Sequence, residues 1–241
     1  MNKQIQCKFK MALQNLIKES AEELRERPSL FAPKILTSIV GSIWMLFLLE
    51  ASKTMNMSHM LLGLAFFPLI FFLGVLSPVI VAEMIKNDYK LKKGVLQTLD
   101  YIPKLLLTSL ILIIVLTAAL LPAYIGLGVA LLYGSYILLI IGLPITMIAA
   151  GMIVYGIYFL PITLTENSAL DSFKESFKAS GENKREVAAL VLFSFVLLGI
   201  TYRATGTLEI LGAAGFILGR ILSSIVSTYT VTLSPKYYIE K

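Results

Sequence analysis

The stretch from Leu105 to Thr165 decides the fold, because it contains no charged residue: LLLTSLILIIVLTAALLPAYIGLGVALLYGSYILLIIGLPITMIAAGMIVYGIYFLPITLT. About 20 apolar residues are enough for one helix to cross a bilayer, and this stretch is about three times that long. It cannot be a core element of a soluble domain. It predicts an all-α integral membrane protein and excludes a soluble enzyme, a nucleic-acid-binding protein and a disordered chain.

The composition of the whole chain agrees with this class. Of its 241 residues, 57% are hydrophobic and 15% are charged, whereas soluble domains average about 45–50% apolar and about 25% charged residues. The net charge is +6, but the basic residues recur between apolar runs instead of forming one patch, so we expect no nucleic-acid partner. The single cysteine, Cys7, excludes an internal disulfide framework. Its place in the charged N-terminal segment predicts an interfacial thiol, with acylation as the alternative.

Apolar runs between charged interruptions predict six transmembrane helices in one domain, residues 29–241. The long uncharged stretch is divided near Leu131–Ser135, since it is too long for one helix. The predicted spans cover about residues 31–49, 60–84, 105–130, 136–160, 187–201 and 208–231. Neighbouring helices can satisfy the backbone groups that an intramembrane proline frees. Kinks are therefore expected at the four prolines inside these spans, Pro68, Pro78, Pro122 and Pro144.

The positions of lysine and arginine predict the orientation, because cytoplasmic loops are enriched in basic residues. With a cytoplasmic N-terminus, the six spans place all but three of the 21 basic residues on the cytoplasmic side. The exceptions are Lys53 and Arg203, on the opposite side, and Arg220, within the sixth span. The sequence thus predicts a multi-pass protein of the cell membrane, embedded in the lipid bilayer, with both termini in the cytoplasm.

Three cytoplasmic segments show the three- and four-residue apolar spacing of amphipathic helices that lie at a membrane interface. They cover residues 1–28, about 91–101 and about 169–179. Pro28 ends the first of them. An amphipathic helix followed by two spans therefore recurs three times, starting near residues 1, 87 and 165, and this order suggests a repeated unit. The alternative is that any cytoplasmic segment between spans tends to be amphipathic.

The third segment and its flanks resemble a large group of prokaryotic six-span membrane proteins. Pro161 closes the fourth predicted span, and the acidic residue of Glu166–Leu170 follows it. An Ala-Leu and serine-rich helix comes next, with Ser172, Phe173 and Ser176. The Gly-Asn-Lys-like turn lies in Ala179–Lys184 and leads into the fifth predicted span. Residues 93–107 are similar to the second internal helix of this group. The group includes the uncharacterised YciC-like and DUF975-like families and the membrane domain attached to some glycerophosphodiester phosphodiesterases. The resemblance implies a helical membrane domain with a role in transport or membrane organisation. It implies no catalytic residues, because the phosphodiesterase chemistry belongs to a separate soluble domain.

Side chains that catalysis needs are scarce in the sequence. His59 is the only histidine, so neither a Ser-His arrangement nor a multi-histidine metal site is expected. No aspartate lies inside a predicted span, and no Gly-x-x-x-x-Gly-Lys-Ser/Thr loop is present to bind ATP. We therefore expect no enzyme activity, no metal and no cofactor. Energy coupling to ATP would need a separate cytoplasmic ATPase subunit. The 169–179 helix offers a docking face for it, made by Leu170, Phe173 and Phe177.

One basic residue, Arg220, lies near the middle of the sixth predicted span, where a charge costs about 2.5–3.5 kcal/mol on insertion scales. Small residues run beside it, namely Gly212, Gly215, Gly219, Ser223 and Ser227. The glycines predict close helix packing, which would place the sixth span centrally with Arg220 directed at a polar partner. Acidic candidates for this partner are Glu50, Glu83 and Glu209, all of which lie toward span ends.

Two interpretations of Arg220 follow. As a structural lock, its guanidinium would bind carbonyl or hydroxyl oxygens and hold the helices together. As a functional group, it would contact an anionic substrate or a lipid headgroup in a water-filled cavity, with Ser223 and Ser227 beside it. The second interpretation predicts a transport-related, permease-like protein for an anionic small molecule or lipid. The alternative function is a structural or membrane-organising protein that acts through its interfacial helices. A homo-oligomer is compatible with both.

Overall fold

The computed structural model describes residues 3–240, with side chains from Gln14 onward. The Cys7 thiol and the apolar side chains that precede Gln14 lie outside the described residues. Over residues 3–240 the chain forms helices and turns without a β-strand. In chain order the elements are α1 (Lys3–Glu26), the 3-10 helix η1 (Pro28–Phe31), α2 (Ala32–Lys53), α3 (Met57–Ala65), α4 (Phe67–Lys86), α5 (Leu91–Leu99), α6 (Ile102–Tyr133), α7 (Ile137–Gly156), α8 (Leu160–Thr163), α9 (Ala169–Glu182), α10 (Lys184–Gly206), the 3-10 helix η2 (Thr207–Leu211) and α11 (Gly212–Ile239).

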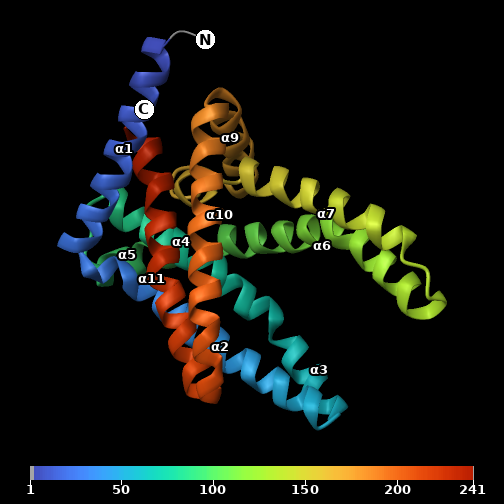
Figure 1. The fold of residues 1–241 in the computed structure, drawn as a ribbon. Helices are drawn as coiled ribbons and strands as arrows, with labels where there is room; N and C mark the ends of the chain where they lie inside the picture. Colours follow the sequence, from blue (N-terminus) through green and yellow to red (C-terminus); the bar gives the residue numbers. More distant parts are fainter. Residues whose placement is uncertain (1–2, 241) are drawn as a thin grey trace.

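Five helical stretches in the described chain are long and apolar enough to cross a membrane. They cover Pro28–Lys53, Met57–Lys86, Ile102–Tyr133, Ile137–Gly156 and Lys184–Ile239. The last stretch folds back at η2, so that α10 and α11 pack against each other as an antiparallel pair (Figure 1). It therefore contributes two long helices, of 23 and 28 residues.

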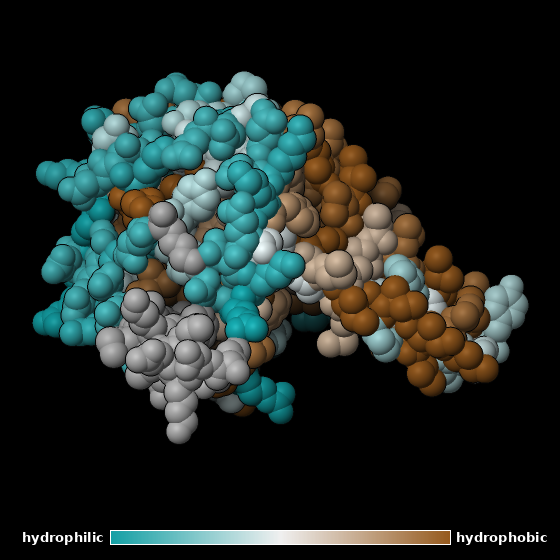
Figure 2. Space-filling model, turned by 90° about the horizontal axis from the view of Figure 1, so that it is seen from above, coloured by the Kyte–Doolittle hydropathy of each residue, from teal (hydrophilic) through white to brown (hydrophobic). Residues whose placement is uncertain are grey.

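The same order of elements occurs three times along the chain (Figure 1). A helix at one end of the molecule, α1, α5 or α9, is followed by an antiparallel hairpin of long helices. The hairpins are α2 with α3–α4, α6 with α7, and α10 with α11. We call the end where α1, α5 and α9 lie the base, and the opposite ends of the hairpins the turns. Seen from above, hydrophilic residues gather over the base, whereas the protruding α6–α7 hairpin is largely hydrophobic (Figure 2).

The second predicted span consists of two helices, because α3 and α4 meet at Phe66, two residues before Pro68. Proline is favoured in the first turn of a helix, where its missing N–H is not needed. Pro68 lies in the first turn of α4, so the stretch Met57–Lys86 is interrupted next to this proline, where the sequence predicts a kink. The prolines that do lie inside helices are Pro78, Pro122, Pro144 and Pro235.

Two helix boundaries at the base also differ from the prediction. Helix α7 ends at Gly156, before the predicted end at residue 160, because α9 packs on this point and the Ser176 hydroxyl donates to the Gly156 carbonyl (2.8 Å). Such a contact satisfies a carbonyl that a helix end leaves without a partner. Helix α11 continues to Ile239, beyond the predicted end at residue 231. Its extension is held in place by α1 and α10, since Leu233 is buried beside Leu16 and Leu190.

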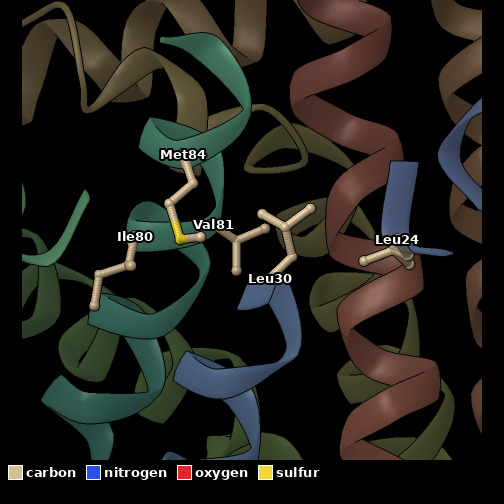
Figure 3. Close-up of a cluster of buried hydrophobic side chains, with 5 residues drawn as sticks. All are labelled: Leu24, Leu30, Ile80, Val81 and Met84. Atoms are coloured by element: carbon tan, nitrogen blue, oxygen red, sulfur yellow. The ribbon is translucent and has the colours of Figure 1, made fainter. Parts of the chain in front are cut away.

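A cluster of buried apolar side chains joins α1 and η1 to α4 at the base (Figure 3). Leu24 comes from α1, Leu30 from η1, and Ile80, Val81 and Met84 from α4. Full burial of one such side chain contributes about 1.5–3 kcal/mol. The C-terminal part of α1 is therefore packed against the ends of the long helices and does not lie with its apolar face in lipid.

Charged contacts at the base connect elements that are far apart in the chain. One contact joins the end of α1 to the α4–α5 turn, one joins α4 to the loop before α9, and one joins α11 to α1. The ion pairs are Arg27–Asp88, Lys86–Glu166 and Lys236–Glu23, with N–O distances of 3.0, 2.9 and 3.5 Å. The three units are thereby linked to one another at the base.

The α6–α7 hairpin contacts the rest of the molecule near the base and then extends away from it (Figures 1 and 2). Its two helices pack closely together: a Cβ at Gly126 would lie 2.7 Å from the carbonyl oxygen of Leu138, and one at Gly142 would overlap the carbonyl of Pro122. Its outward side chains are large and exposed, for example Leu131 at 77%. Apolar surface on this scale is not stable in water, so the hairpin must be surrounded by lipid.

Candidate functional site

Arg220 lies in the third of α11 that is closest to the hairpin turn. At 1.5 Å per residue it is about 12 Å along the helix axis from Gly212. The sequence placed Arg220 at the middle of the sixth span, but α11 is longer than that span at its base end. Helix α11 is central in the molecule, since it contacts α1, α2, α4, α8 and α10.

Arg220 borders a cavity of about 240 Å³ between α2, α4 and α11. The other lining residues are Ser38, Gly41, Ser42, Trp44, Met45, Ile70 and Phe216. Gly41 keeps this space open, because a Cβ at this position would have no atom within 4 Å. The cavity is therefore formed by the contact of α2 with α11, two helices that are remote in the sequence.

One wall of the cavity carries polar groups that are fixed by hydrogen bonds. The Ser38 hydroxyl donates to the Arg220 carbonyl (2.9 Å), and the Ser42 hydroxyl donates to the Ser38 carbonyl (2.7 Å). The indole of Trp44 donates to the Gly63 carbonyl (2.8 Å) of α3. Both serine oxygens keep free lone pairs after these donations, so this wall can accept hydrogen bonds from a ligand or its bound water.

The Arg220 guanidinium is in contact with two aromatic rings. Its central carbon lies 5.1 Å from the ring centre of Phe216 and 5.6 Å from that of Tyr202. Cation–π contacts at such distances are favourable, but they leave the N–H donors of the guanidinium available. Within the part of the chain that the structure describes, no carboxylate lies within ion-pair distance of Arg220.

None of the three acidic candidates pairs with Arg220. Glu209 borders the same narrow gap between α10 and α11 without forming an ion pair. Glu83 lies at the base, where Asn87 donates to its Oε1 (2.8 Å) and its Oε2 is buried without a hydrogen-bond partner. Glu50 lies in the last turn of α2, where its carbonyl caps the helix end. Among residues 14–240, the positive charge of Arg220 is therefore balanced by aromatic rings alone.

The small residues beside Arg220 face α10 and η2. A Cβ at Gly215 would overlap the carbonyl oxygen of Leu208, and a Cβ at Gly219 would lie 3.0 Å from the carbonyl oxygen of Thr205. The Ser223 hydroxyl is 3.0 Å from the Thr205 hydroxyl and donates to the Gly219 carbonyl (2.9 Å). These residues bring α10 and α11 close together.

Gly212 and Ser227 do not have the contacts that the sequence predicts for them. Gly212 does not pack against a neighbour, since a Cβ there would meet nothing within 4 Å; it has a φ of +70° and starts α11 after η2. A positive φ is easily adopted only by glycine, so its role is conformational. Ser227 lies almost two turns beyond Arg220 and does not line the cavity that Arg220 borders.

Helix α9 packs on the base through its small residues. Ala169, Ser172, Ser176, Ala179 and Ser180 are its buried positions. Besides the contact with Gly156, the Ser172 hydroxyl donates to the Thr163 carbonyl (3.1 Å). Sequence reasoning missed this serine face, although its three- and four-residue spacing was visible. Ser168 caps the helix, and its hydroxyl donates to the Asp171 carboxylate (2.6 Å), which holds the pKa of that carboxyl below its usual value.

The predicted docking face of α9 is divided in the structure. Phe173 packs against Leu105, Leu160 and Leu164 in the interior. Leu170 and Phe177 are 59% and 50% exposed. Part of the Phe177 ring covers Gly156. Two of the three predicted residues thus remain accessible to lipid or to a partner.

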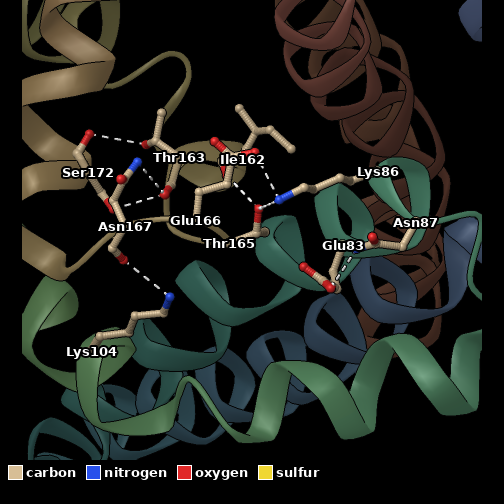
Figure 4. Close-up of polar contacts among 10 residues, drawn as sticks. All are labelled: Glu83, Lys86, Asn87, Lys104, Ile162, Thr163, Thr165, Glu166, Asn167 and Ser172. Atoms are coloured by element: carbon tan, nitrogen blue, oxygen red, sulfur yellow. Dashed lines mark hydrogen bonds and ion pairs between the residues drawn. The ribbon is translucent and has the colours of Figure 1, made fainter.

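A second polar cluster joins α4 and α6 to the segment before α9 (Figure 4). Lys86 pairs with Glu166 (2.9 Å) and donates to the Thr165 hydroxyl (3.3 Å). Lys104 donates to the carbonyl of Asn167 (3.2 Å). The partners are more than 60 residues apart, so no local sequence signal indicates them. Both lysines already have partners, and this cluster therefore connects the units, in contrast to Arg220.

The described residues show no arrangement typical of a metal or catalytic centre. Among the side chains that the structure describes, residues 14–240, no three His, Cys, Asp or Glu residues gather at metal-binding distance. His59 packs edge-on against Phe47, and its backbone N–H donates to the side chain of Asn56, which caps α3. That the protein has no catalytic centre, metal or cofactor stays a prediction.

Long apolar helices, lipid-facing hairpins and a polar base together define a polytopic helical membrane protein. A family model described as a domain of unknown function, DUF7847, matches residues 11–238. The chain belongs to this family. No curated protein and no solved structure matches the chain. The resemblance to the YciC-like, DUF975-like and phosphodiesterase-associated membrane families is thus supported only as far as an uncharacterised membrane family.

Proposed function

We propose that the protein is a transport-related, permease-like membrane protein that binds the anionic group of a lipid or small molecule at Arg220. The observation that carries this proposal is Arg220 itself, which lines the α2–α4–α11 cavity and whose guanidinium has no carboxylate partner among the described residues. A charge inside a membrane normally faces protein partners or a water-filled pathway. An anionic ligand would supply the missing counter-charge.

The proposed orientation has six membrane crossings, with the base and both termini in the cytoplasm. The basic residues support it, because α1, α5 and α9 and their flanks carry most of the lysines and arginines. Arg220 then lies inside the bilayer at the level of Ser38, in the base-side half of α2. The two basic residues on the outer side, Lys53 and Arg203, lie in the last turns of α2 and α10.

The chemistry of the cavity favours a phosphate or carboxylate group. Guanidinium donors match the oxygens of these groups in a two-pronged geometry, and the serine wall can hydrogen-bond a protonated oxygen or bound water. The aromatic and aliphatic lining of Trp44, Met45 and Ile70 would contact the apolar part of the ligand. A small volume of about 240 Å³ suits a headgroup or a small anion.

The first test is Arg220→Met in detergent-solubilised protein, with Trp44 emission as the readout. Trp44 is the only tryptophan of the chain and lines the cavity. Titration with phosphatidylglycerol should change the emission of the wild type, and Arg220→Met should weaken binding at least tenfold, because hydrogen bonds to charged groups are lost. Arg220→Lys should lie between the two. Phosphatidylcholine serves as the uncharged lipid, and inorganic phosphate tests whether the anion alone suffices.

Arg203→Met is the matched control, since Arg203 is exposed at the same end of the molecule. It should bind phosphatidylglycerol like the wild type. The proposal fails if Arg220→Met keeps the wild-type melting temperature and also the wild-type affinity. Unfolding of Arg220→Met would instead assign Arg220 the role of a structural lock. A second variant then tests whether the cavity binds a ligand.

Gly41→Leu is that second variant, because it fills the cavity and leaves Arg220 intact. The new side chain enters space where no atom lies within 4 Å, so the protein should fold while the binding of phosphatidylglycerol is lost. Gly74→Leu is the control, since Gly74 of α4 is exposed and its surroundings are equally open. Equal affinity of Gly41→Leu and Gly74→Leu for the lipid would contradict a ligand site in this cavity.

The alternative function, a membrane-organising protein, is favoured by the exposed apolar residues of the base helices. Leu96 and Leu99 of α5 are exposed, as are Leu170 and Phe177 of α9. Such residues suit contact with the inner leaflet or with a cytoplasmic partner such as a separate ATPase. A wild-type protein whose Trp44 emission responds to neither lipid nor phosphate would favour this alternative.

A further inference from the structure

A second cavity lies on the other side of α11, where α7 leaves the α10–α11 pair. Its volume is about 340 Å³, within the usual range of small-molecule sites. It is lined by Val154, Tyr158, Pro161, Val191, Ser194, Phe195, Leu198, Thr230, Val231 and Ser234. No charged residue is among them, and most of the lining is apolar. The cavity shares no lining residue with the Arg220 cavity.

Two residues that line this cavity carry a hydroxyl group that has no hydrogen-bond partner among the described residues. The hydroxyls of Tyr158 and Ser194 are both buried and unpaired among the described residues. Ser194 is unusual in this respect, because serine and threonine in helices commonly donate to a carbonyl one turn back. Ser42 and Thr201 do so in this chain. A buried hydroxyl without a partner costs about 1–3 kcal/mol, so an acceptor on a ligand would stabilise both groups.

The lining also changes along the membrane normal. Tyr158, Pro161 and Ser234 lie at the base end of the cavity, near the helix ends. Leu198 lies farther from the base, about 21 Å along α10 from Lys184. The Tyr158 hydroxyl group therefore belongs to the base end of the cavity, Ser194 lies one turn before Leu198, and Phe195 and Leu198 form the apolar end deeper in the membrane. A membrane lipid has the same order, with acceptor oxygens at its glycerol linkages followed by an alkyl chain.

We propose that this cavity binds one alkyl chain of a membrane lipid from the base-side leaflet, with its linkage oxygens accepting hydrogen bonds from Tyr158 and Ser194. The absence of charged lining residues excludes a charged peptide segment as the occupant. The cavity is partly open and lies between α7 and the α10–α11 pair, and the α6–α7 hairpin diverges from this pair (Figure 1). Ester carbonyl and ether oxygens are both acceptors without a donor, and either would satisfy the two hydroxyls. The inference is independent of the role of Arg220.

The test uses full-length protein that has been delipidated in mild detergent, and native mass spectrometry counts the bound lipids. Phosphatidylcholine and its diether analogue are the probes, since neither carries a net charge that Arg220 would select. The wild type should retain one tightly bound molecule of at least one probe. Tyr158→Phe combined with Ser194→Ala should weaken its binding about tenfold, because two hydrogen bonds are lost. A preference for the ester lipid would identify the carbonyl as the acceptor.

Leu198→Trp tests the apolar end of the cavity and should abolish retention by filling it. Leu192→Trp is the control, because Leu192 lies on the same helix and is 65% exposed. Melting temperatures separate binding from folding: without lipid, the Tyr158→Phe/Ser194→Ala variant should be at least as stable as the wild type, since it removes two unpaired hydroxyls. The proposal is overturned if the wild type retains neither probe, or if both cavity variants retain lipid as the wild type does.

Discussion

Gly215→Ala is expected to destabilise the protein by about 3 kcal/mol, the upper part of the range for overpacked sites. The added methyl group would overlap the carbonyl oxygen of Leu208 and also lie 2.7 Å from the Cβ of Leu211. Backbone atoms of η2 cannot move aside as the end of a flexible side chain could. Relief would require α11 to separate from the turn, which would also disturb the contact at Gly219. The free energy of unfolding in mixed detergent micelles measures this effect.

Gly199→Ala is the matched control on the adjacent helix α10. A Cβ at Gly199 meets nothing within 4 Å, and alanine is the better helix former by about 1 kcal/mol. This variant should therefore be as stable as the wild type or slightly more stable. If Gly215→Ala were no less stable than Gly199→Ala, the close approach of α11 to η2 would be wrong.

Arg27→Ala should lower the free energy of unfolding by about 2 kcal/mol, because hydrogen bonds to charged groups contribute about 1.5–3 kcal/mol and the partly exposed ion pairs add little. The guanidinium pairs with Glu23 (2.8 Å) and Asp88 (3.0 Å), and it donates to the carbonyls of Met84 (2.9 Å) and Tyr89 (2.8 Å). One side chain thus connects α1 to the α4–α5 turn through four acceptors. Its removal leaves the half-buried carboxylate of Glu23 with Lys236 alone.

The neighbouring residue gives the comparison for this prediction. Arg25 is exposed on the same helix, and Arg25→Ala should change the stability by less than about 0.5 kcal/mol. Arg27→Lys should be intermediate, because an ammonium group keeps the charge but cannot reach four acceptors in a planar arrangement. Equal stability of Arg25→Ala and Arg27→Ala would show that the contacts of Arg27 do not hold the base together.

Much of the fold could be predicted because it follows from local chemistry. A charge-free stretch between Lys104 and Glu166 can only be buried in lipid, and its length requires two helices, which the structure provides as α6 and α7. The end of α1 follows from Pro28, which cannot continue a helix beyond its first turn. The end of α7 was not predictable in the same way, because it depends on Ser176, a residue of another helix.

Of the candidate site, Arg220 could be predicted from the sequence, but the residues that form the cavity around it could not. Arg220 stands out in any sequence of this composition, because a charge between glycine and isoleucine inside a span is costly. Its cavity depends on Ser38 and Gly41, which are about 180 residues away and have no distinctive local pattern. The stripe of small residues beside Arg220 predicts Ser223 as a ligand-binding residue, but its hydroxyl donates to the Gly219 carbonyl and contacts the Thr205 hydroxyl of α10. Spacing in the sequence predicts which residues share one face of a helix. Tertiary packing decides which residues of other helices contact that face.

The ion pairs at the base have a consequence for the shape of the protein in a bilayer. They hold the three units together at one end only, while the α6–α7 hairpin diverges from the others toward its turn (Figures 1 and 2). In the proposed orientation the molecule therefore occupies a larger cross-section in the outer leaflet than in the inner one. Such a wedge displaces unequal numbers of lipids on the two sides, so curvature and lateral pressure act directly on the angle between its hairpins.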